Sequence, residues 1–460
     1  MAVEKLLGSV PELWEYTTLG AACEQGGGDI QTGPFGSQLH ASDYVPVGIP
    51  SIMPQNIGDN RILEDGIARI TPEDAKRLSR YLVCKGDIVY SRRGDVERRA
   101  LVREHEDGWL CGTGCLRVRL GEKGVDPRYA SFYLSHPGVR EWIVRHAHGA
   151  TMPNLNTSIL SACPFLIPPP LEQRAIAHTL STLDDKIELN RRMNETLEAM
   201  ARALFKSWFV DFDPVRAKAE GRDTGLPKEI ADLFPDSFEE SEMGEIPRGW
   251  NVSILGDVVE TIKGRSYKSE ELAESNTALV TLKSFARGGG YRPDGLKSFT
   301  GTYRPEQIVN PGELVIACTD VTQAAEVIGR PVLVRASPVH KALVASLDTM
   351  IVRPRFTSVT RSFLYFLMGT QEFVDHTYAH TTGTTVLHLA KGAVPSYKFV
   401  CPTAAAARVF DNLACSVLDR IQSNEQHSRT LSTIRDTLLP KLISGELRLK
   451  DAEPFIGRVA

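Results

Sequence analysis

The sequence contains no apolar run that approaches the roughly 18 residues needed to cross a membrane. Its first residues also lack a basic flank followed by an apolar stretch, so we expect neither a membrane anchor nor a secretory signal. The eight cysteines are scattered, and Cys111-x3-Cys115 has no second pair at ligand spacing, which argues against zinc and against a disulfide framework. These absences predict a cytoplasmic protein with reduced thiols and no metal site.

An excess of positive charge is absent too. The 53 Lys and Arg residues are outnumbered by 57 Asp and Glu, and the net charge of −4 excludes a generally basic nucleic-acid-binding coat. It does not exclude local basic clefts, because affinity for phosphate depends on where Lys and Arg lie rather than on their sum.

The motifs of common catalytic sites are missing as well. The sequence has no Gly-x4-Gly-Lys-Ser/Thr, no strand-borne Gly-x-Gly-x-x-Gly, no His-Glu-x-x-His and no Gly-x-Ser-x-Gly. The Asn/Asp-Pro-Pro-aromatic motif with which amino-methyltransferases hold a base is also absent. Pro235-Asp236 and Pro293-Asp294 lack the other ligands of a nuclease-like metal site, and the few histidines show no pairing between repeats. We therefore expect no catalytic residue and no cofactor in this chain.

What is present is an internal repeat. Asp185-Lys-Ile-Glu-Leu-Asn190 returns as Asp419-Arg-Ile-Gln-Ser-Asn424, an offset of 234 residues (419 minus 185) in a chain of 460. The same offset relates Gly149 to Gly383, Leu155 to Leu389 and Phe165 to Phe399. A repeat of this length is too long for a solenoid. The chain is therefore a tandem duplication, which predicts two similar sites and a target in two parts.

Each repeat has a globular part followed by a long helix. The globular parts combine turn-rich segments and short strands, such as the alternating run Cys115–Leu120, with a helical stretch at 127–146 or 361–376. They are therefore expected to be mixed α and β. Prolines at 168–170 and 402 end each globular part. The predicted segments are a first domain (1–170), a first helix (171–212), a linker (213–249), a second domain (250–402) and a second helix (403–449).

Both long helices carry apolar residues at seven-residue spacing, which is typical of helices that pack together. Since the first helix leads from one domain to the other, a pair with the second helix must be antiparallel. The alternative is that each helix lies on its own domain. Asn190 and Asn424 are expected to meet near the crossing point and to set the register. The predicted helix-pair interface consists of Ile176, Leu183, Ile187, Asn190, Leu197, Val417, Ile421, Asn424 and Leu431.

The strongest binding candidate is the segment 91–99, which places four arginines around a glycine turn directly after a strand. Such a loop can present guanidinium groups to phosphates or to guanine edges, although a solvated loop with internal ion pairs explains the composition equally well. Its repeat mate at 317–323 is polar but not basic, as expected of modules that bind different sequences. The DNA-binding candidates are Arg92, Arg93, Arg98, Arg99, Asn154, Asn156, Arg287, Tyr291, Arg292, Thr319 and Gln323.

The end of the first helix is unusually aromatic. Trp208, Phe209 and Phe212 exceed what a solvated helix end needs, so we assign them to a subunit interface or to packing on the second domain.

These residues resemble the specificity subunit of type I restriction-modification systems over nearly the whole chain. The resemblance is carried by these segments: Gly33-Pro-Phe-Gly-Ser-Gln-Leu39 with Asp43-Tyr44, Gly48-Ile-Pro50 and Gln55-Asn-Ile57; Gly86-Asp-Ile-Val89; Ile167-Pro-Pro-Pro-Leu-Glu-Gln-Arg174; Leu204-Phe-Lys-Ser-Trp-Phe-Val-Asp-Phe-Asp-Pro214; and Leu438-Leu-Pro-Lys-Leu-Ile-Ser-Gly-Glu-Leu447. The second repeat departs from the pattern, because it lacks the Gly-Pro-Phe-Gly-Ser loop and has an alanine run at 403–408 in place of Leu-Glu-Gln-Arg.

The resemblance implies an α+β fold in which two similar mixed α/β target-recognition domains are separated by two long antiparallel coiled-coil helices, a pseudo-twofold tandem duplication. It further implies that each domain binds half of an interrupted double-stranded DNA target. Two methyltransferase subunits, which use S-adenosylmethionine, and restriction subunits that translocate DNA with ATP and Mg²⁺ would dock on this frame. The chain itself would be non-catalytic.

Two alternatives stay open from the sequence. One is a scaffold whose duplicated domains bind two proteins and ignore DNA. The other is a specificity polypeptide that serves a different restriction class. The recognised bases, the gap between half-sites and the subunit stoichiometry cannot be read from the residues.

Overall fold

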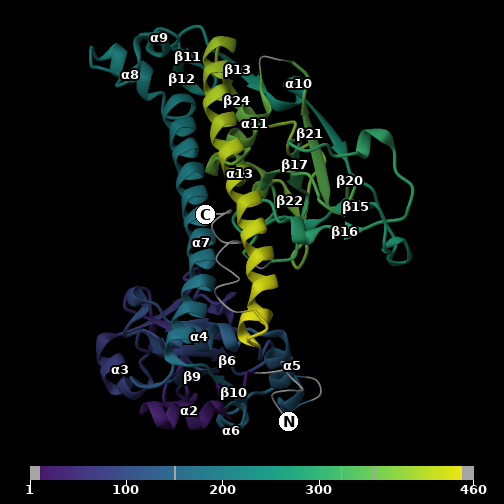
Figure 1. The fold of residues 1–460 in the computed structure, drawn as a ribbon. Coiled ribbons are helices and arrows are strands. Elements are labelled where there is room, and N and C mark those ends of the chain that lie inside the picture. The colour runs from purple at the N-terminus through teal and green to yellow at the C-terminus, as the bar shows by residue number, and fades with distance from the viewer. Residues whose placement is uncertain (1–10, 150–151, 323, 357–358, 448–460) are drawn as a thin grey trace. The chain divides into compact units, whose positions relative to one another are not determined.

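The computed structural model describes residues 11–149, 152–322, 324–356 and 359–447, which form two compact units. Unit 1 is formed by residues 1–191 with 425–460, and unit 2 by residues 192–424. Figure 1 labels the elements of both units. Unit 2 is therefore one continuous segment, whereas unit 1 combines two segments that lie on either side of it in the sequence.

The central sheet of each unit has four antiparallel strands in the same order. In unit 1 the order is β2 (Asp29–Thr32), β9 (Cys115–Arg119), β6 (Ile88–Ser91) and β7 (Arg99–Leu101). In unit 2 it is β14 (Val259–Lys263), β21 (Thr349–Pro354), β17 (Leu314–Ala317) and β19 (Pro331–Leu333). The duplication read from the sequence is therefore also a duplication of topology.

The smaller sheets repeat as well. In unit 1 a second sheet has the order β3 (Tyr44–Val45), β5 (Ala68–Ile70), β4 (Ile49–Ile52) and β8 (Leu110–Cys111), with β4 and β8 parallel. Its counterpart is β16 (Lys297–Ser298), β15 (Thr277–Val280) and β20 (Ala342–Ala345), with β15 and β20 parallel. The remaining pairs and ladders are β1 (Glu15–Thr18) with β10 (Pro164–Ile167), β13 (Asn251–Ile254) with β24 (Lys398–Cys401), β11 (Phe238–Ser241) with β12 (Gly244–Pro247), and β18 (Thr319–Asp320) with β23 (Leu387–Leu389) and β22 (Thr381–Thr382).

The helical stretches expected at 127–146 and 361–376 are each two helices rather than one. Unit 1 has α4 (Pro127–Tyr133) and α5 (Pro137–His146), because His136 caps the second helix and Pro137 occupies its first turn. Unit 2 has α11 (Arg361–Met368) and α12 (Gln371–Ala379), with Thr370 as the cap between them. The short helices are α2 (Leu19–Gly26), α3 (Pro72–Arg77), α6 (Thr157–Ser161), α8 (Asp213–Ala219), α9 (Lys228–Ala231) and α10 (Leu255–Val258).

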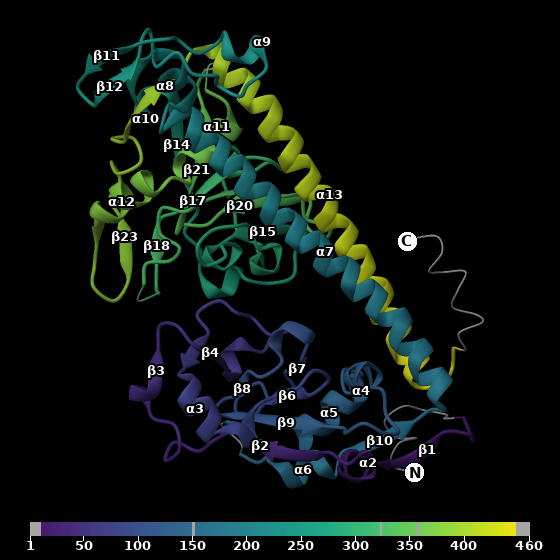
Figure 2. The ribbon, with the colours of Figure 1, turned by 90° about the vertical axis from the view of Figure 1, so that its left-hand side faces the viewer.

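The two long helices have 40 residues each, α7 (Pro170–Phe209) and α13 (Ala404–Ile443). They run side by side in Figure 1 and in Figure 2, which turns the view by 90°. Their direction follows from contacts inside the units. In unit 1 Asn190 Nδ2 donates to Ser428 Oγ (3.1 Å), and in unit 2 Asn424 Nδ2 donates to Asn194 Oδ1 (2.8 Å). From Asn190 to Asn194 the position in α7 advances by four residues, while the partner in α13 moves back by four, from Ser428 to Asn424. The expected antiparallel pairing is therefore confirmed.

The residues assigned to the helix-pair interface lie in both units. Ile176, Leu183 and Leu431 are buried in the core of unit 1, with Ile187 packed against it. In unit 2 Val417 packs against the core, and Ile421 is buried. Leu197 is half-buried. Asn190 and Asn424 are both buried, and the contact expected between them stays a prediction.

The alternative that each helix lies on its own domain also describes part of the packing. Phe410 and Ala414 of α13 share the unit 2 core with residues of the second domain, and Ala406 and Ala407 of the alanine run are buried. Thr403 caps this helix, because its hydroxyl accepts from the Ala406 amide (3.3 Å). Each long helix therefore packs against a domain as well as against the other helix.

The assignment of Trp208, Phe209 and Phe212 to a subunit interface is wrong. Their side chains are 2%, 5% and 7% exposed and lie in the core of unit 2. The ring of Phe209 lies 5.2 Å from that of Phe363 and 5.4 Å from that of Phe410. Side chains so fully covered by their own chain leave no surface for a partner, so the second alternative, packing on the second domain, is the correct one.

Phe209→Ala should therefore lower the free energy of unfolding of unit 2 by about 3 to 5 kcal/mol, the usual cost of deleting a buried aromatic side chain. Met200→Ala, on the same helix at 62% exposure, is the matched control and should change stability by less than about 0.5 kcal/mol. Urea unfolding of the full chain measures both. An unchanged midpoint for Phe209→Ala, with loss of partner binding, would restore the interface assignment.

Candidate nucleic-acid interface

Three loops of unit 1 meet where the strands of its central sheet end. Strands β2 and β6 finish at this end of the sheet, and β9 and β7 begin there, because neighbouring strands are antiparallel. The loops are 33–39, 92–98 and 112–114, and we call this end of the sheet the reading edge of unit 1. The antiparallel topology alone brings together segments that lie far apart in the sequence.

Hydrogen bonds hold these loops to one another. The Gly33 amide donates to the Cys115 carbonyl (2.9 Å), and the Thr113 hydroxyl donates to the Pro34 carbonyl (3.1 Å). The Arg92 amide donates to the Gly114 carbonyl (2.8 Å). The Arg92 guanidinium lies 5.8 Å from the centre of the Phe35 ring, a cation–π contact. The Gly-Pro-Phe-Gly-Ser loop and the arginine loop thus form one surface.

A fourth segment, of which residues 148–149 and 152–154 are described, joins the same edge. The Asn154 amide donates to the His148 carbonyl (2.7 Å), so His148 and Asn154 form a β-bridge, and we call this segment the hairpin of unit 1. It is attached to the arginine loop by two bonds, from the Gly94 amide to the Pro153 carbonyl (3.1 Å) and from the Leu155 amide to the Arg92 carbonyl (2.8 Å). The structure therefore brings the predicted residues Arg92, Arg93 and Asn154 together.

The arginines of the loop differ in their surroundings. Arg93 is exposed, and Arg98 is exposed with an ion pair to Asp95 (3.1 Å). Arg92 is half-buried. Arg93, Arg98 and the accessible part of Arg92 provide positive charge at the reading edge. If the loop were only a solvated loop with internal ion pairs, its arginines would pair with its own acidic residues. Among the described contacts, Arg98 makes such a pair, with Asp95.

Arg99 does not belong to this surface, which corrects its assignment to DNA binding. Its side chain is 5% exposed, and Nε donates to the Ser131 carbonyl (2.9 Å). Burial lowers the pKa of this guanidinium. Because side chains alternate across a strand, Arg98 and Arg99 point to opposite faces, and only Arg98 faces solvent.

The two candidate asparagines also separate. The Asn156 side chain caps α6, with Oδ1 accepting from the Ile159 amide (2.8 Å), so this amide oxygen is used for structure. Asn154 Oδ1 is buried and has no hydrogen-bond partner in the part of the chain that the structure describes. Asn154 is therefore the better candidate for binding.

The reading edge of unit 2 occupies the equivalent end of its sheet. Thr319 follows β17, is buried, and has its hydroxyl 3.4 Å from His388 Nδ1 of β23. Gln323 lies outside the described residues. Arg287 is exposed and pairs with Glu326 (3.4 Å), and Arg292 pairs with Asp294 (2.5 Å). Tyr291 packs against the core of the β15 region.

Asp320, which the sequence did not single out as a site residue, organises the unit 2 loop. One carboxylate oxygen accepts from the Thr322 amide (2.7 Å), and the other accepts from the Val327 and Ile328 amides (2.7 and 2.9 Å). Burial opposes ionisation, but these hydrogen bonds lower the pKa of Asp320. Its carboxylate therefore keeps the loop in shape rather than facing a ligand.

Two further features were missed. Arg330 occupies the place of Arg98, since the Ala317 amide donates to the Arg330 carbonyl (3.3 Å) as the Ser91 amide donates to the Arg98 carbonyl (3.0 Å). His146 and His380 are repeat mates at the same offset of 234, so the statement that no histidines are paired between repeats is wrong. The histidine pair is visible in the sequence at the repeat offset, whereas the place of Arg330 follows from the backbone hydrogen bond.

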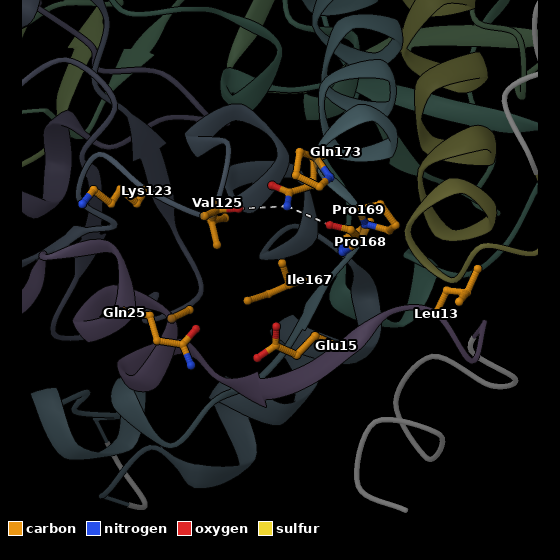
Figure 3. Close-up of a pocket in the computed structure, with 12 residues that line it drawn as sticks. Leu13, Glu15, Gln25, Lys123, Val125, Ile167, Pro168, Pro169 and Gln173 are labelled. Atoms are coloured by element: carbon orange, nitrogen blue, oxygen red, sulfur yellow. Dashed lines mark hydrogen bonds between the residues drawn. The ribbon is translucent and has the colours of Figure 1, made fainter.

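The proline-rich motif lies away from the reading edge and holds the start of α7. Gln173 Nε2 donates to the carbonyls of Gly124 (3.0 Å) and Pro168 (2.8 Å), and its Oε1 accepts from the Asp126 amide (2.8 Å). Figure 3 shows Gln173 above a pocket of about 310 Å³ that Glu15, Lys123 and the prolines also line. The motif is therefore structural within unit 1.

The sequence of this chain is similar to those of known DNA-specificity proteins. The family model described as "Type I restriction modification DNA specificity domain" matches residues 11–199. The chain is thus similar to the specificity subunits of type I restriction-modification systems. The HindI specificity subunit of Haemophilus influenzae is 24% identical, over 86% of this chain and 95% of that protein. The MjaIX specificity subunit of Methanocaldococcus jannaschii is also 24% identical, over 97% of this chain and 96% of its own length.

A solved structure shows the same fold. The S subunit of a type I restriction-modification system from M. genitalium matches with a TM-score of 0.51 at 16% identity, over 94% of this chain and 96% of that one. The expected fold class, two similar mixed domains with two long antiparallel helices, is thereby confirmed. Among the described residues, no helix is both long and apolar enough to cross a membrane.

The two asparagines provide a test of the site's construction. Asn156→Ala should lower the free energy of unfolding by about 1 kcal/mol, because it removes a helix cap. Asn154→Ala should cost less, since it removes a buried oxygen that lacks a partner among the described residues. Chemical denaturation of both variants measures the difference. An equal or larger loss for Asn154→Ala would show that its side chain, too, is structural.

Proposed function

We propose that this specificity subunit binds an interrupted DNA sequence, with the reading edge of each unit contacting one half-site. The observation that carries the proposal is that one sheet edge is built twice with the same topology and with different side chains. Unit 1 has Arg92, Arg93 and Asn154 at this edge, whereas unit 2 has the buried Thr319 and the exposed His388 at the positions equivalent to Arg93 and Asn154. Two similar frames with unlike contact groups suit two unlike half-sites.

We assign two kinds of contact to these edges. Exposed arginines beside a sheet edge neutralise phosphates, and a guanidinium fork can also read guanine in the major groove. The amide of Asn154 has the donor and acceptor that adenine requires, and its buried Oδ1 must become accessible for this contact to form. The net charge of −4 is compatible with DNA binding, because the basic residues need to be concentrated only at the surface that contacts the DNA.

The same proposal includes partner subunits. Two methyltransferase subunits, which use S-adenosylmethionine, and restriction subunits, which use ATP and Mg²⁺, would dock on this chain. This chain would determine which DNA sequence the complex binds. The name of each relative as a specificity subunit supports this division of labour. Since Trp208, Phe209 and Phe212 are core residues, the docking surface consists of other residues.

The alternatives predict different results. A scaffold that binds two proteins would not retard duplex DNA with or without a methyltransferase partner. A specificity polypeptide of another restriction class would bind DNA in the same way but with a different nuclease partner, which the neighbouring genes identify. The built reading edges favour the DNA-binding function over the scaffold.

Arg93→Ala should weaken binding of the full chain to its target duplex by about 1 to 3 kcal/mol if Arg93 contacts a base, and should lower the salt slope by about one if it contacts a phosphate. Lys123→Ala is the matched control, because Lys123 is exposed beyond the opposite end of β9. Fluorescence anisotropy at several salt concentrations separates the two outcomes. Unchanged affinity for Arg93→Ala at every salt concentration would contradict the assignment of this edge.

A further inference from the structure

The hairpins at the two reading edges share an unusual glycine. Gly149 and Gly383 are repeat mates with φ angles of 103° and 102°, a conformation that other residues rarely adopt. A side chain at Gly149 would meet the Met152 carbonyl oxygen at 2.6 Å, and one at Gly383 would meet that of Val386 at 2.1 Å. At each glycine the absence of a side chain thus allows close approach to the carbonyl of the residue three positions later.

That residue is apolar and exposed in both hairpins. Met152 is 61% exposed and Val386 is 36% exposed, and they are separated by the repeat offset of 234. The residues around Val386 are polar, with exposed Thr384 and Thr385 just before it. A single exposed apolar side chain is ordinary. Here, however, an exposed apolar residue recurs at the same position, with the same glycine geometry, in two diverged repeats. We therefore consider this position a candidate for contact with a ligand common to both hairpins.

We propose that Met152 and Val386 contact base edges of the DNA, each as an apolar specificity determinant of one half-site. This inference rests on the proposed function. An apolar side chain in the major groove distinguishes thymine by its methyl group from bases that lack it. Met and Val differ in length and branching, so the two hairpins would select different bases.

The position of the hairpins favours DNA over a protein partner. In unit 1 the hairpin is bonded to the arginine loop through the Gly94 amide and the Pro153 carbonyl. In unit 2 Leu387, the neighbour of Val386, pairs with Asp320 of the loop after β17. The apolar side chains are therefore continuous with the groups assigned to DNA rather than with a separate apolar face.

The test is selection of bound duplexes from a random library by the full chain in complex with its methyltransferase subunits. Wild type, Met152→Ser and Val386→Ser are compared with Val47→Ser and Val339→Ser, which alter exposed apolar residues in other loops. We expect each hairpin variant to lose roughly fivefold or more discrimination at one or two base pairs of one half-site. The other half-site and both control variants should keep the wild-type sequence preference.

A second variant tests the glycine as a positioning residue. Gly383→Ala keeps Val386 but displaces the hairpin, so it should relax the same base pairs as Val386→Ser. A uniform fall in affinity with unchanged base preference, or no change in any hairpin variant, would overturn the inference while leaving the proposed function intact. Failure of the wild-type complex to enrich any sequence would instead overturn the proposed function, and this inference with it.

Discussion

The antiparallel packing of α7 and α13 is the interaction on which the rest of the structure depends. In unit 1 the core of the first domain is completed by Leu431, Leu438 and Leu442, which come from the other end of the chain. In unit 2 the aromatic side chains of α7 and Phe410 of α13 pack into the second domain. Neither domain has a complete core without both helices, so the fold requires contacts between residues more than two hundred positions apart.

This constraint explains how the repeats diverged. The parts that build the frame are kept: the strand order is the same in both units, and Gly149 returns as Gly383. Core positions on the long helices stay apolar although the residues differ, as with Ile176 and Phe410. The loops at the reading edges are free to change, because they contribute little to the core. Arg93 and Asn154 in one unit therefore correspond to Thr319 and His388 in the other.

The sequence allowed the duplication, both long helices and their antiparallel direction to be predicted, because the seven-residue periodicity and the constant repeat offset can both be read without knowledge of packing. It did not separate Arg98 from Arg99, since which face of β7 is covered depends on α4 and on Ser131, distant in sequence. For a related reason the role of Asn156 was missed, and the sequence left the aromatic residues near 208 between a subunit interface and packing on the second domain. The residue types that cap helices or fill cores also occur at binding sites. Only the packing around a residue shows which of these roles it has. The pairing of His146 with His380, in contrast, was visible and overlooked.

The central claim is that one chain carries two unlike readers of DNA on a shared frame. Sequencing of methylated adenines in host DNA, with and without this gene, tests it most directly. The account predicts methylation at one motif with two different specific parts separated by a gap of fixed length, and its loss without the gene. A single uninterrupted motif, a motif with identical halves, or methylation that does not depend on the gene would contradict it.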